Sequence, residues 1–191
     1  MSIVVAVKYK DGIAVACDTQ STKNGIKTNG VKKFKYFEDS NTLLGIAGYL
    51  RDCNVISDIE EIIPYKDLFH KINITEEYVI SVIIPFLYEQ FLCRGRIDSS
   101  GSFPVIGSSL LYITKDKIFT IDCDFGVMEI TDNSFFCVGS GEELTRGYLS
   151  AVGDTSELNE EAVTELIHQA ITIGCENCTT VNDEIFIKYI K

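Results

Sequence analysis

The residue that follows Met1 is a serine, and a serine at the start of a chain brings together two groups that catalysis can use. Removal of Met1, which is common before small residues, would leave Ser2 with both a hydroxyl and a free α-amine. An α-amine has an ordinary pKa of about 7.7 to 8.0, so near neutral pH much of it is unprotonated and can take the proton from the hydroxyl. Ser2 is therefore a candidate nucleophile that carries its own base. The position alone is weak evidence, because every chain begins with some residue.

Other patterns that could carry chemistry are poor in this sequence. Cys175 and Cys178 have the spacing of a zinc or redox pair, but no second pair and no nearby histidine completes four ligands. His70 and His168 lie in amphipathic stretches and are interpreted as surface or partly buried helix residues. No glycine-rich segment has the spacing of a phosphate loop followed by Lys and Ser or Thr. We therefore expect no metal and no cofactor.

Composition excludes several classes of protein. The 191 residues are 46% hydrophobic and 24% charged, which is typical of a folded globular chain and too apolar for disorder. The net charge of -11 repels phosphate backbones and anionic lipid, so we expect no nucleic-acid or membrane partner. Polar residues interrupt the longest apolar run, 78–92, and no export signal precedes the first strand. Seven scattered cysteines suit a reducing compartment, so we expect a cytoplasmic protein with a single domain, 1–191.

The elements that would position Ser2 begin with a hairpin at the N-terminus. Its two strands are separated by turn residues at 10–12 and are apolar on both faces, so their sheet should be covered on each side. A polar stretch over 19–30 follows the hairpin. Four strands are expected before the first helix: residues 2–8, 13–18, 31–37 and 41–47.

Two pairs of helices are expected, at 49–63 and 75–92 and again at 142–152 and 159–174. The second is apolar almost all round and is therefore expected to be buried, with Thr75 as its N-cap and a kink at Pro85. Asn159 is the expected N-cap of the last helix. Five further strands are expected at 108–114, 117–121, 126–130, 134–138 and 184–190.

The order is therefore strands, two helices, strands, two helices and a final strand, without an internal repeat or a linker. Two sheets packed between two pairs of helices are the economical solution for such an order. The sequence predicts an α+β fold, a four-layer αββα sandwich of two mainly antiparallel sheets.

Five segments resemble, in the same order and with matching spacing, the proteasome β-subunit family, and most closely its bacterial HslV-like peptidases. They are 2–7, 16–22, 29–33, 45–48 and 136–141. Asp18 lies 16 residues after Ser2 and Lys33 lies 12 residues before Gly45, as in the family pattern. The resemblance extends to about Asn182 and is weakest between 66 and 102. It implies the fold of the N-terminal-nucleophile (Ntn) hydrolases.

The resemblance also implies a role for each matching residue. Ser2 would be the nucleophile, where most of the family has threonine. Lys33 would lower the pKa of the Ser2 hydroxyl or amine, and Asp18 would keep Lys33 charged. The backbone N–H of Gly48 would face the developing oxyanion. Ser140 would form a hydrogen bond near the terminal amine.

Two further residues depart from the family pattern. Glu176 stands where the family usually has aspartate, and Thr179 where it usually has serine. The resemblance implies that both support the amine from further away. Serine in place of threonine at position 2 also removes the methyl group that restricts the side-chain rotamer, which should position the nucleophile less well.

Simpler interpretations stay open for the same residues. Lys32 and Lys33 can be a solvated pair on an edge strand, Asp18 can cap the turn that follows it, and the Gly-Ser-Gly at 139–141 opens many helices.

The predicted function is a self-compartmentalising peptidase that cleaves unfolded proteins with an N-terminal serine. The resemblance implies a homo-oligomeric ring or double ring and a separate AAA+ ATPase that unfolds the protein substrate. One alternative is a catalytically inactive ring subunit that retains Met1 and serves as scaffold or regulator. The other is an Ntn hydrolase that acts on a small amide.

Overall fold

One antiparallel sheet carries the N-terminal segment. The computed structural model describes residues 2–60, 73–131 and 134–191, and this sheet has the strand order β10-β1-β2-β11. The strands are β1 (Ile3–Tyr9), β2 (Gly12–Asp18), β10 (Phe135–Gly139) and β11 (Ile185–Ile190). The predicted hairpin at the N-terminus is confirmed, and β1 is a central strand because it pairs with both β2 and β10.

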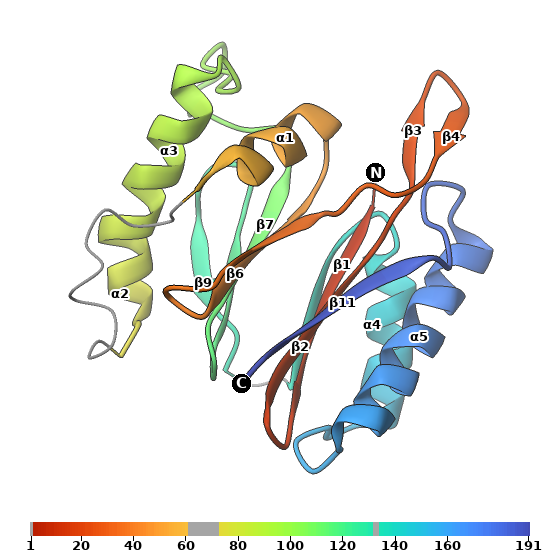
Figure 1. Cartoon of the computed structure of the whole chain (residues 1–191). Helices are drawn as coiled ribbons and strands as arrows, with labels where there is room; N and C mark the ends of the chain where they lie inside the picture. The colour runs from red at the N-terminus through yellow and green to blue at the C-terminus, as the bar shows by residue number, and fades with distance from the viewer. Residues whose placement is uncertain (1, 61–72, 132–133) are drawn as a thin grey trace.

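A second antiparallel sheet faces the first (Figure 1). Its strand order is β5-β6-β7-β8-β9. The strands are β5 (Phe34–Phe37), β6 (Thr42–Ala47), β7 (Ser109–Ile113), β8 (Ile118–Ile121) and β9 (Val127–Glu129). The β5–β6 and β7–β9 groups come from the two separate runs of strands expected from the sequence.

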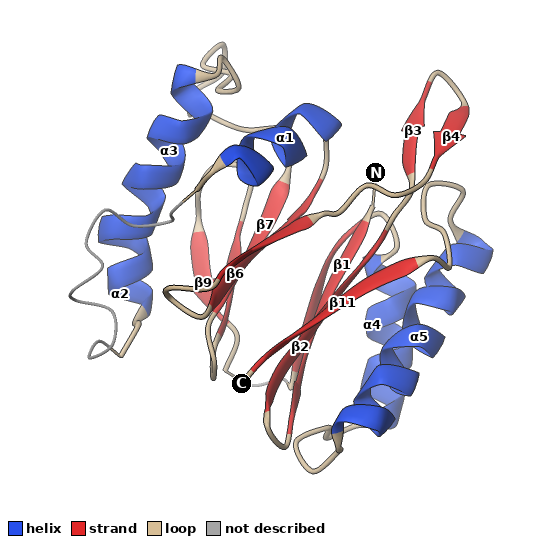
Figure 2. Cartoon of the chain, viewed as in Figure 1, coloured by secondary structure: helices blue, strands red, loops and turns tan. Residues whose placement is uncertain are grey.

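Helices cover the outer face of each sheet (Figure 2). One face carries α1 (Leu50–Asp58), α2 (Glu76–Tyr78), a π-helical segment (Val79–Ile83) and α3 (Ile84–Cys93). The other carries α4 (Glu142–Val152) and α5 (Glu160–Asn177). Three apolar clusters fill the spaces between successive layers. The predicted four-layer αββα sandwich is confirmed.

Strand β1 shows why its sequence is apolar throughout. Ile3, Val5 and Val7 pack toward the layer of α4 and α5, whereas Val4 and Ala6 pack toward the second sheet. All five side chains are fully buried. A strand with both faces covered needs no polar alternation, so the continuous apolar run is the expected pattern.

A small hairpin, β3 (Ser21–Lys23) and β4 (Ile26–Thr28), was not predicted. Asn24 and Gly25 both have positive φ, 51° and 78°, which is the backbone conformation that two-residue hairpin turns require. Six strands therefore precede the first helix rather than four. The six residues of β3 and β4 are too polar for the buried pattern by which the other strands were recognised.

The expectations for the helix over 75–92 are confirmed for its N-cap but not for its burial. Thr75 caps its start, since its hydroxyl accepts the Tyr78 N–H at 3.2 Å. Ile84 donates its N–H to the carbonyl of Val79, a π-helical bond placed one residue before Pro85. The expectation of complete burial is wrong, because Ile80 and Leu92 are about half exposed, 50% and 52%.

Two helix ends also differ from the sequence pattern. Helix α1 stops at Asp58, and the expected end of that helix, at 63, lies outside the described residues. Helix α5 continues to Asn177, three residues beyond the expected end at 174.

Candidate active site

Ser2 lies directly before β1, and its side chain is almost completely buried at the wall of a pocket of about 570 Å³. Its carbonyl oxygen accepts the N–H of Ser140 at 2.8 Å. Gly139 permits this approach, because a Cβ at that position would lie 2.0 Å from the Ser2 carbonyl oxygen and its φ is 114°. The pairing of Ile3 with Gly139 in the sheet therefore holds Ser2 in place.

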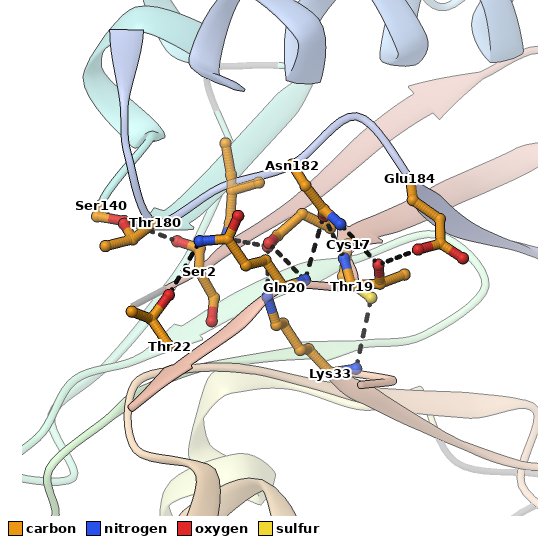
Figure 3. Close-up of polar contacts among 12 residues, drawn as sticks. Ser2, Cys17, Thr19, Gln20, Thr22, Lys33, Ser140, Thr180, Asn182 and Glu184 are labelled. Atoms are coloured by element: carbon orange, nitrogen blue, oxygen red, sulfur yellow. Dashed lines mark hydrogen bonds and ion pairs between the residues drawn. The ribbon is translucent and has the colours of Figure 1, made fainter. Parts of the chain in front are cut away.

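Asp18 and Lys33 form a buried ion pair. The side chain of Lys33 extends toward Ser2 (Figure 3). Oδ1 of Asp18 lies 2.6 Å from Nζ of Lys33, with 0% and 2% of the two side chains exposed. The same oxygen accepts the N–H of Ile3 at 2.8 Å, and Oδ2 accepts the N–H of Gln20 at 3.1 Å. Among the described residues, Asp18 is the only polar partner of the ammonium. Lys33 also lines the pocket, so its charge acts on the groups there.

Cys17 precedes Asp18 and is a structural neighbour of the ion pair rather than a second nucleophile. Its sulfur accepts the backbone N–H of Lys33 at 3.4 Å. Burial raises the pKa of the Cys17 thiol to about 12, an effect that the nearby Lys33 does not cancel. The thiolate, which is the reactive form of cysteine, is therefore scarce at neutral pH.

Gly48 follows β6 and lines the same pocket as Ser2 and Lys33. Its backbone N–H forms no hydrogen bond with any residue in the described parts of the chain. A Cβ on Gly48 would lie 2.1 Å from Oγ of Ser108, so a glycine is required there. The free N–H is the kind of donor that stabilises an oxyanion in a pocket.

Ser140 links the N-terminal segment to the end of α5. Its hydroxyl lies 2.7 Å from Oγ1 of Thr180, and its backbone N–H binds the Ser2 carbonyl. The thiol of Cys178 lies 3.5 Å from Oγ of Ser140 and 3.1 Å from Oγ1 of Thr180. Ser140, Thr180 and Cys178 thus form one polar cluster next to Ser2.

The structure brings Ser2, Asp18, Lys33, Gly48 and Ser140 together and leaves the other two predicted residues outside. Glu176 lies in the last turn of α5 and is exposed, and so is Thr179. Thr179 contributes its backbone carbonyl, which accepts from Nε2 of Gln20 at 2.9 Å. The hydroxyl that reaches Ser140 belongs to Thr180, one residue later.

Three residues outside the predicted site, Thr19, Asn182 and Glu184, join the segment after α5 to the end of β2. Oδ1 of Asn182 accepts the N–H groups of Thr19 and Gln20, and its amide donates to Oγ1 of Thr19. Oγ1 of Thr19 donates to Glu184 at 2.9 Å. Five of the six residues at 179–184 are polar, which was a usable signal, because buried polar groups need partners.

The remaining candidates contribute little. His168 is exposed on α5, and His70 lies outside the described residues. Across 2–60, 73–131 and 134–191, no three His, Cys, Asp or Glu side chains form a cluster suited to a metal. None of the helices in these ranges combines the length and apolar character needed to cross a bilayer.

The pocket therefore contains the three kinds of group that acyl transfer requires. Ser2 supplies a hydroxyl, Lys33 a buried positive charge and Gly48 an unpaired backbone N–H. The hydroxyl becomes a nucleophile once a base accepts its proton. Such a site suits the cleavage of an ester or an amide.

The fold is that of an Ntn hydrolase. The family model described as "Proteasome subunit" matches residues 2–190, so the chain belongs to the proteasome subunit family. The predicted membership is confirmed, and with it the class of enzyme, an N-terminal-nucleophile peptidase.

Individual relatives agree along nearly the whole chain. The ATP-dependent protease subunit HslV of Campylobacter concisus (strain 13826) is 25% identical over 183 residues, which cover 95% of this chain and 93% of that protein. Two solved structures share the fold. A Gly-1 mutant of Anbu from Hyphomicrobium sp. strain MC1 superposes with a TM-score of 0.74 at 16% identity, covering 99% of this chain and 81% of the other. BPH from Thiobacillus denitrificans gives a TM-score of 0.71 at 17% identity, covering 99% and 98%.

Proposed function

We propose that this chain is a peptidase that uses Ser2 as its nucleophile after Met1 is removed. The observation that carries the proposal is that Ser2, the buried Lys33 and the unpaired N–H of Gly48 line one pocket. Loss of Met1 would free the α-amine of Ser2, which would then act as the base for its own hydroxyl. We infer that Ser2 serves here in the role that threonine has in most of the family.

The reaction begins when the α-amine of Ser2 takes the hydroxyl proton and Oγ attacks the carbonyl carbon of a peptide bond. The carbonyl π electrons move to oxygen and form a tetrahedral oxyanion, which the N–H of Gly48 stabilises. Removing a comparable donor costs about 2.7 to 4 kcal/mol in other enzymes. The positive charge of Lys33 favours the deprotonated forms of the hydroxyl and amine.

Collapse of the oxyanion breaks the C–N bond, and the protonated α-amine of Ser2 gives its proton to the departing nitrogen. The acyl group is then an ester on Oγ of Ser2. A water molecule, deprotonated by the same amine, attacks this ester and releases the second product as a carboxylic acid. Ser2 is regenerated with its hydroxyl and amine, so the cycle needs neither a metal nor a cofactor.

We also propose that the chain assembles into a homo-oligomeric ring or double ring in the cytoplasm, and that a separate AAA+ ATPase supplies unfolded protein. The Campylobacter relative is named as an ATP-dependent protease subunit, which supports a partnership of this kind. The sequence itself has no phosphate loop. The half-exposed Ile80 and Leu92 on the helical layer give apolar surface that a neighbouring subunit can cover.

Intact mass spectrometry of the cellular protein tests the first requirement, and we expect a mass lower by one methionine. Processed protein should hydrolyse fluorogenic peptides. Ser2→Ala should abolish this turnover without changing assembly, whereas Ser2→Thr should retain or raise it. Equal activity of Ser2→Ala and the parent would remove Ser2 from the mechanism. Retention of Met1 in every molecule would favour an inactive ring subunit.

Light scattering at micromolar concentration tests the assembly, and we expect at least six subunits per particle. A particle of 21.3 kDa, the mass of one chain, would exclude both ring proposals and favour a hydrolase of small amides.

A further inference from the structure

Helix α1 has Tyr49 as its N-cap residue, and Tyr49 directly follows Gly48. A residue far away in the sequence, Ser108, supports this end of the helix. The N-cap residue, Tyr49, makes no cap hydrogen bond with its own side chain. Instead Oγ of Ser108, which precedes β7, accepts the N–H of Tyr49 at 3.1 Å. The same hydroxyl donates to Oδ2 of Asp52, in the first turn of α1, at 2.7 Å. The Ser108 hydroxyl is therefore fixed both as a hydrogen-bond acceptor and as a hydrogen-bond donor.

Asp52 is a fully buried carboxylate, and Arg96 supplies its counter-charge. Nε of Arg96 lies 2.5 Å from Oδ1 of Asp52, while Oδ2 receives the Ser108 hydroxyl. Burying a carboxylate without a partner is costly, and the Arg96 guanidinium offsets that cost for Asp52. The result is a chain of contacts that runs from Arg96 through Asp52 and Ser108 to the backbone of Tyr49.

This chain of contacts ends at the peptide unit that adjoins Gly48. With the Tyr49 N–H held by Ser108, the plane of the Gly48–Tyr49 peptide is fixed. Ser108 also closes the space beside Gly48, where no Cβ would fit. The preceding N–H, that of Gly48, is left without a partner among the described residues and lines the pocket with Ser2.

We propose that Ser108 and Asp52, with Arg96 behind them, are positioning residues for the reaction, because they hold the Gly48 N–H where the oxyanion forms. This inference rests on the proposed function, since it assigns a purpose to the Gly48 N–H. None of the three needs to touch the reacting atoms. A role confined to helix capping would instead change stability while leaving the balance between substrate binding and turnover unaltered.

The test compares two probes that react with the same nucleophile. With a peptide aldehyde, Oγ of Ser2 adds to the carbonyl carbon and the Ser2 hydroxyl proton moves to the carbonyl oxygen. This oxygen occupies the oxyanion position. A peptide vinyl sulfone adds Oγ to the terminal carbon of its C=C bond, and the proton ends on the neighbouring carbon. Its negative charge develops away from the oxyanion position, so the second probe reports the nucleophile alone.

For Ser108→Ala we expect kcat for a fluorogenic peptide to fall by about 10- to 100-fold with KM nearly unchanged. Affinity for the aldehyde should fall by a similar factor. The rate of inactivation by the vinyl sulfone should stay within about twofold of the parent. If Ser108→Ala fails to fold, Asp52→Asn is tested by the same three measurements, with the same expected results. Arg94→Gln is the matched control, because Arg94 also forms an ion pair with a residue of α1, Asp58, at 2.6 Å, but on the surface. This variant should leave kcat, KM and the reactions with both probes unchanged.

The outcomes separate the two proposals. Equal losses with both probes, or no loss with either, would overturn the positioning role while leaving Ser2 as nucleophile. A parent whose Ser2 reacts with neither probe would overturn the proposed function, and this inference with it.

Discussion

Oδ1 of Asp18 is shared between Nζ of Lys33, 2.6 Å away, and the backbone N–H of Ile3, 2.8 Å away. One carboxylate therefore holds the charge beside the pocket and also the first residue of β1. Breaking a buried ion pair by removing one partner typically costs about 3 to 5 kcal/mol. The Asp18–Lys33 pair thus connects the stability of the N-terminal strand with the electrostatics of the site.

Lys33→Ala should abolish peptide hydrolysis and lower the free energy of unfolding by about 3 to 5 kcal/mol, because it leaves Asp18 buried without its counter-charge. The matched control is Lys32→Ala, since Lys32 is exposed and its described contact is with the ring of Phe34. Urea denaturation and a fluorogenic assay measure the two effects. Inactivation by Lys32→Ala with an active Lys33→Ala would show that the alignment of the segment before β5 with the family pattern is off by one residue.

Gly48→Ala should reduce kcat by about 100-fold or more, because the new Cβ displaces the peptide whose N–H stabilises the oxyanion. The control is Gly147→Ala in α4, where an added Cβ meets nothing within 4 Å. That change should keep activity and stabilise the protein by about 0.5 to 1 kcal/mol, as expected for glycine within a helix. Steady-state kinetics and thermal melting of the two variants distinguish a local effect from a general one. Full activity of Gly48→Ala would argue against Gly48 as donor.

Thr180→Val should lower kcat by about tenfold, because it removes the hydroxyl that binds Ser140 while keeping the shape of the side chain. Thr179→Val changes an exposed side chain, so we expect a much smaller loss from it. Comparison of kcat for the two variants shows which of the two adjacent threonines supports catalysis. A larger loss from Thr179→Val than from Thr180→Val would support the role that the family resemblance implies for Thr179.

Iodoacetamide at about pH 8 should modify Cys178 well before Cys17, Cys53 or Cys137. Burial raises the pKa values of Cys17 and Cys137 to about 12 and that of Cys53 to about 11. Partial burial also acts to raise the pKa of Cys178, but its hydrogen bonds with Ser140 and Thr180 outweigh this effect and the pKa is lowered. A lowered pKa leaves more thiolate at a given pH, which speeds alkylation.

Peptide mapping by mass spectrometry locates the alkylated residue. Modification at Cys178 should reduce peptide hydrolysis, because the added group separates Ser140 from Thr180. Cys178→Ala should abolish the part of the inhibition that maps to Cys178, and inhibition through the exposed, pocket-lining Cys123 should remain. Modification of Cys17 at a rate equal to that of Cys178 would contradict the prediction.

The sandwich was predictable because long apolar strands and amphipathic helices follow from local patterns in the sequence. The grouping of Ser2, Asp18 and Lys33 was available only through the resemblance to the proteasome β-subunit family, which implied a role for each of them. The contact between the hydroxyls of Thr180 and Ser140 was not predictable in the same way, because helix α5 extends to Asn177, three residues beyond its expected end.

The Asp52–Ser108–Arg96 contacts were not predictable for a different reason. Ser108 and Asp52 are 56 residues apart, and no local pattern relates the residue before β7 to the first turn of α1. Only the pairing of β6 with β7 brings them together. The hairpin β3–β4 was missed because its short, polar strands lack the buried pattern, although its Asn-Gly turn was visible in the sequence.

The position of β1 in the middle of its sheet has a consequence for amide hydrogen exchange. The first residues of most chains fray, and their N–H protons exchange with solvent quickly. Here the Ile3 N–H is held by Asp18, and Val4 and Val5 lie between two neighbouring strands. These protons should exchange only when the whole sheet opens, at a free energy close to that of global unfolding. Loss of the catalytic geometry on heating should therefore coincide with the cooperative melting of the core and not precede it.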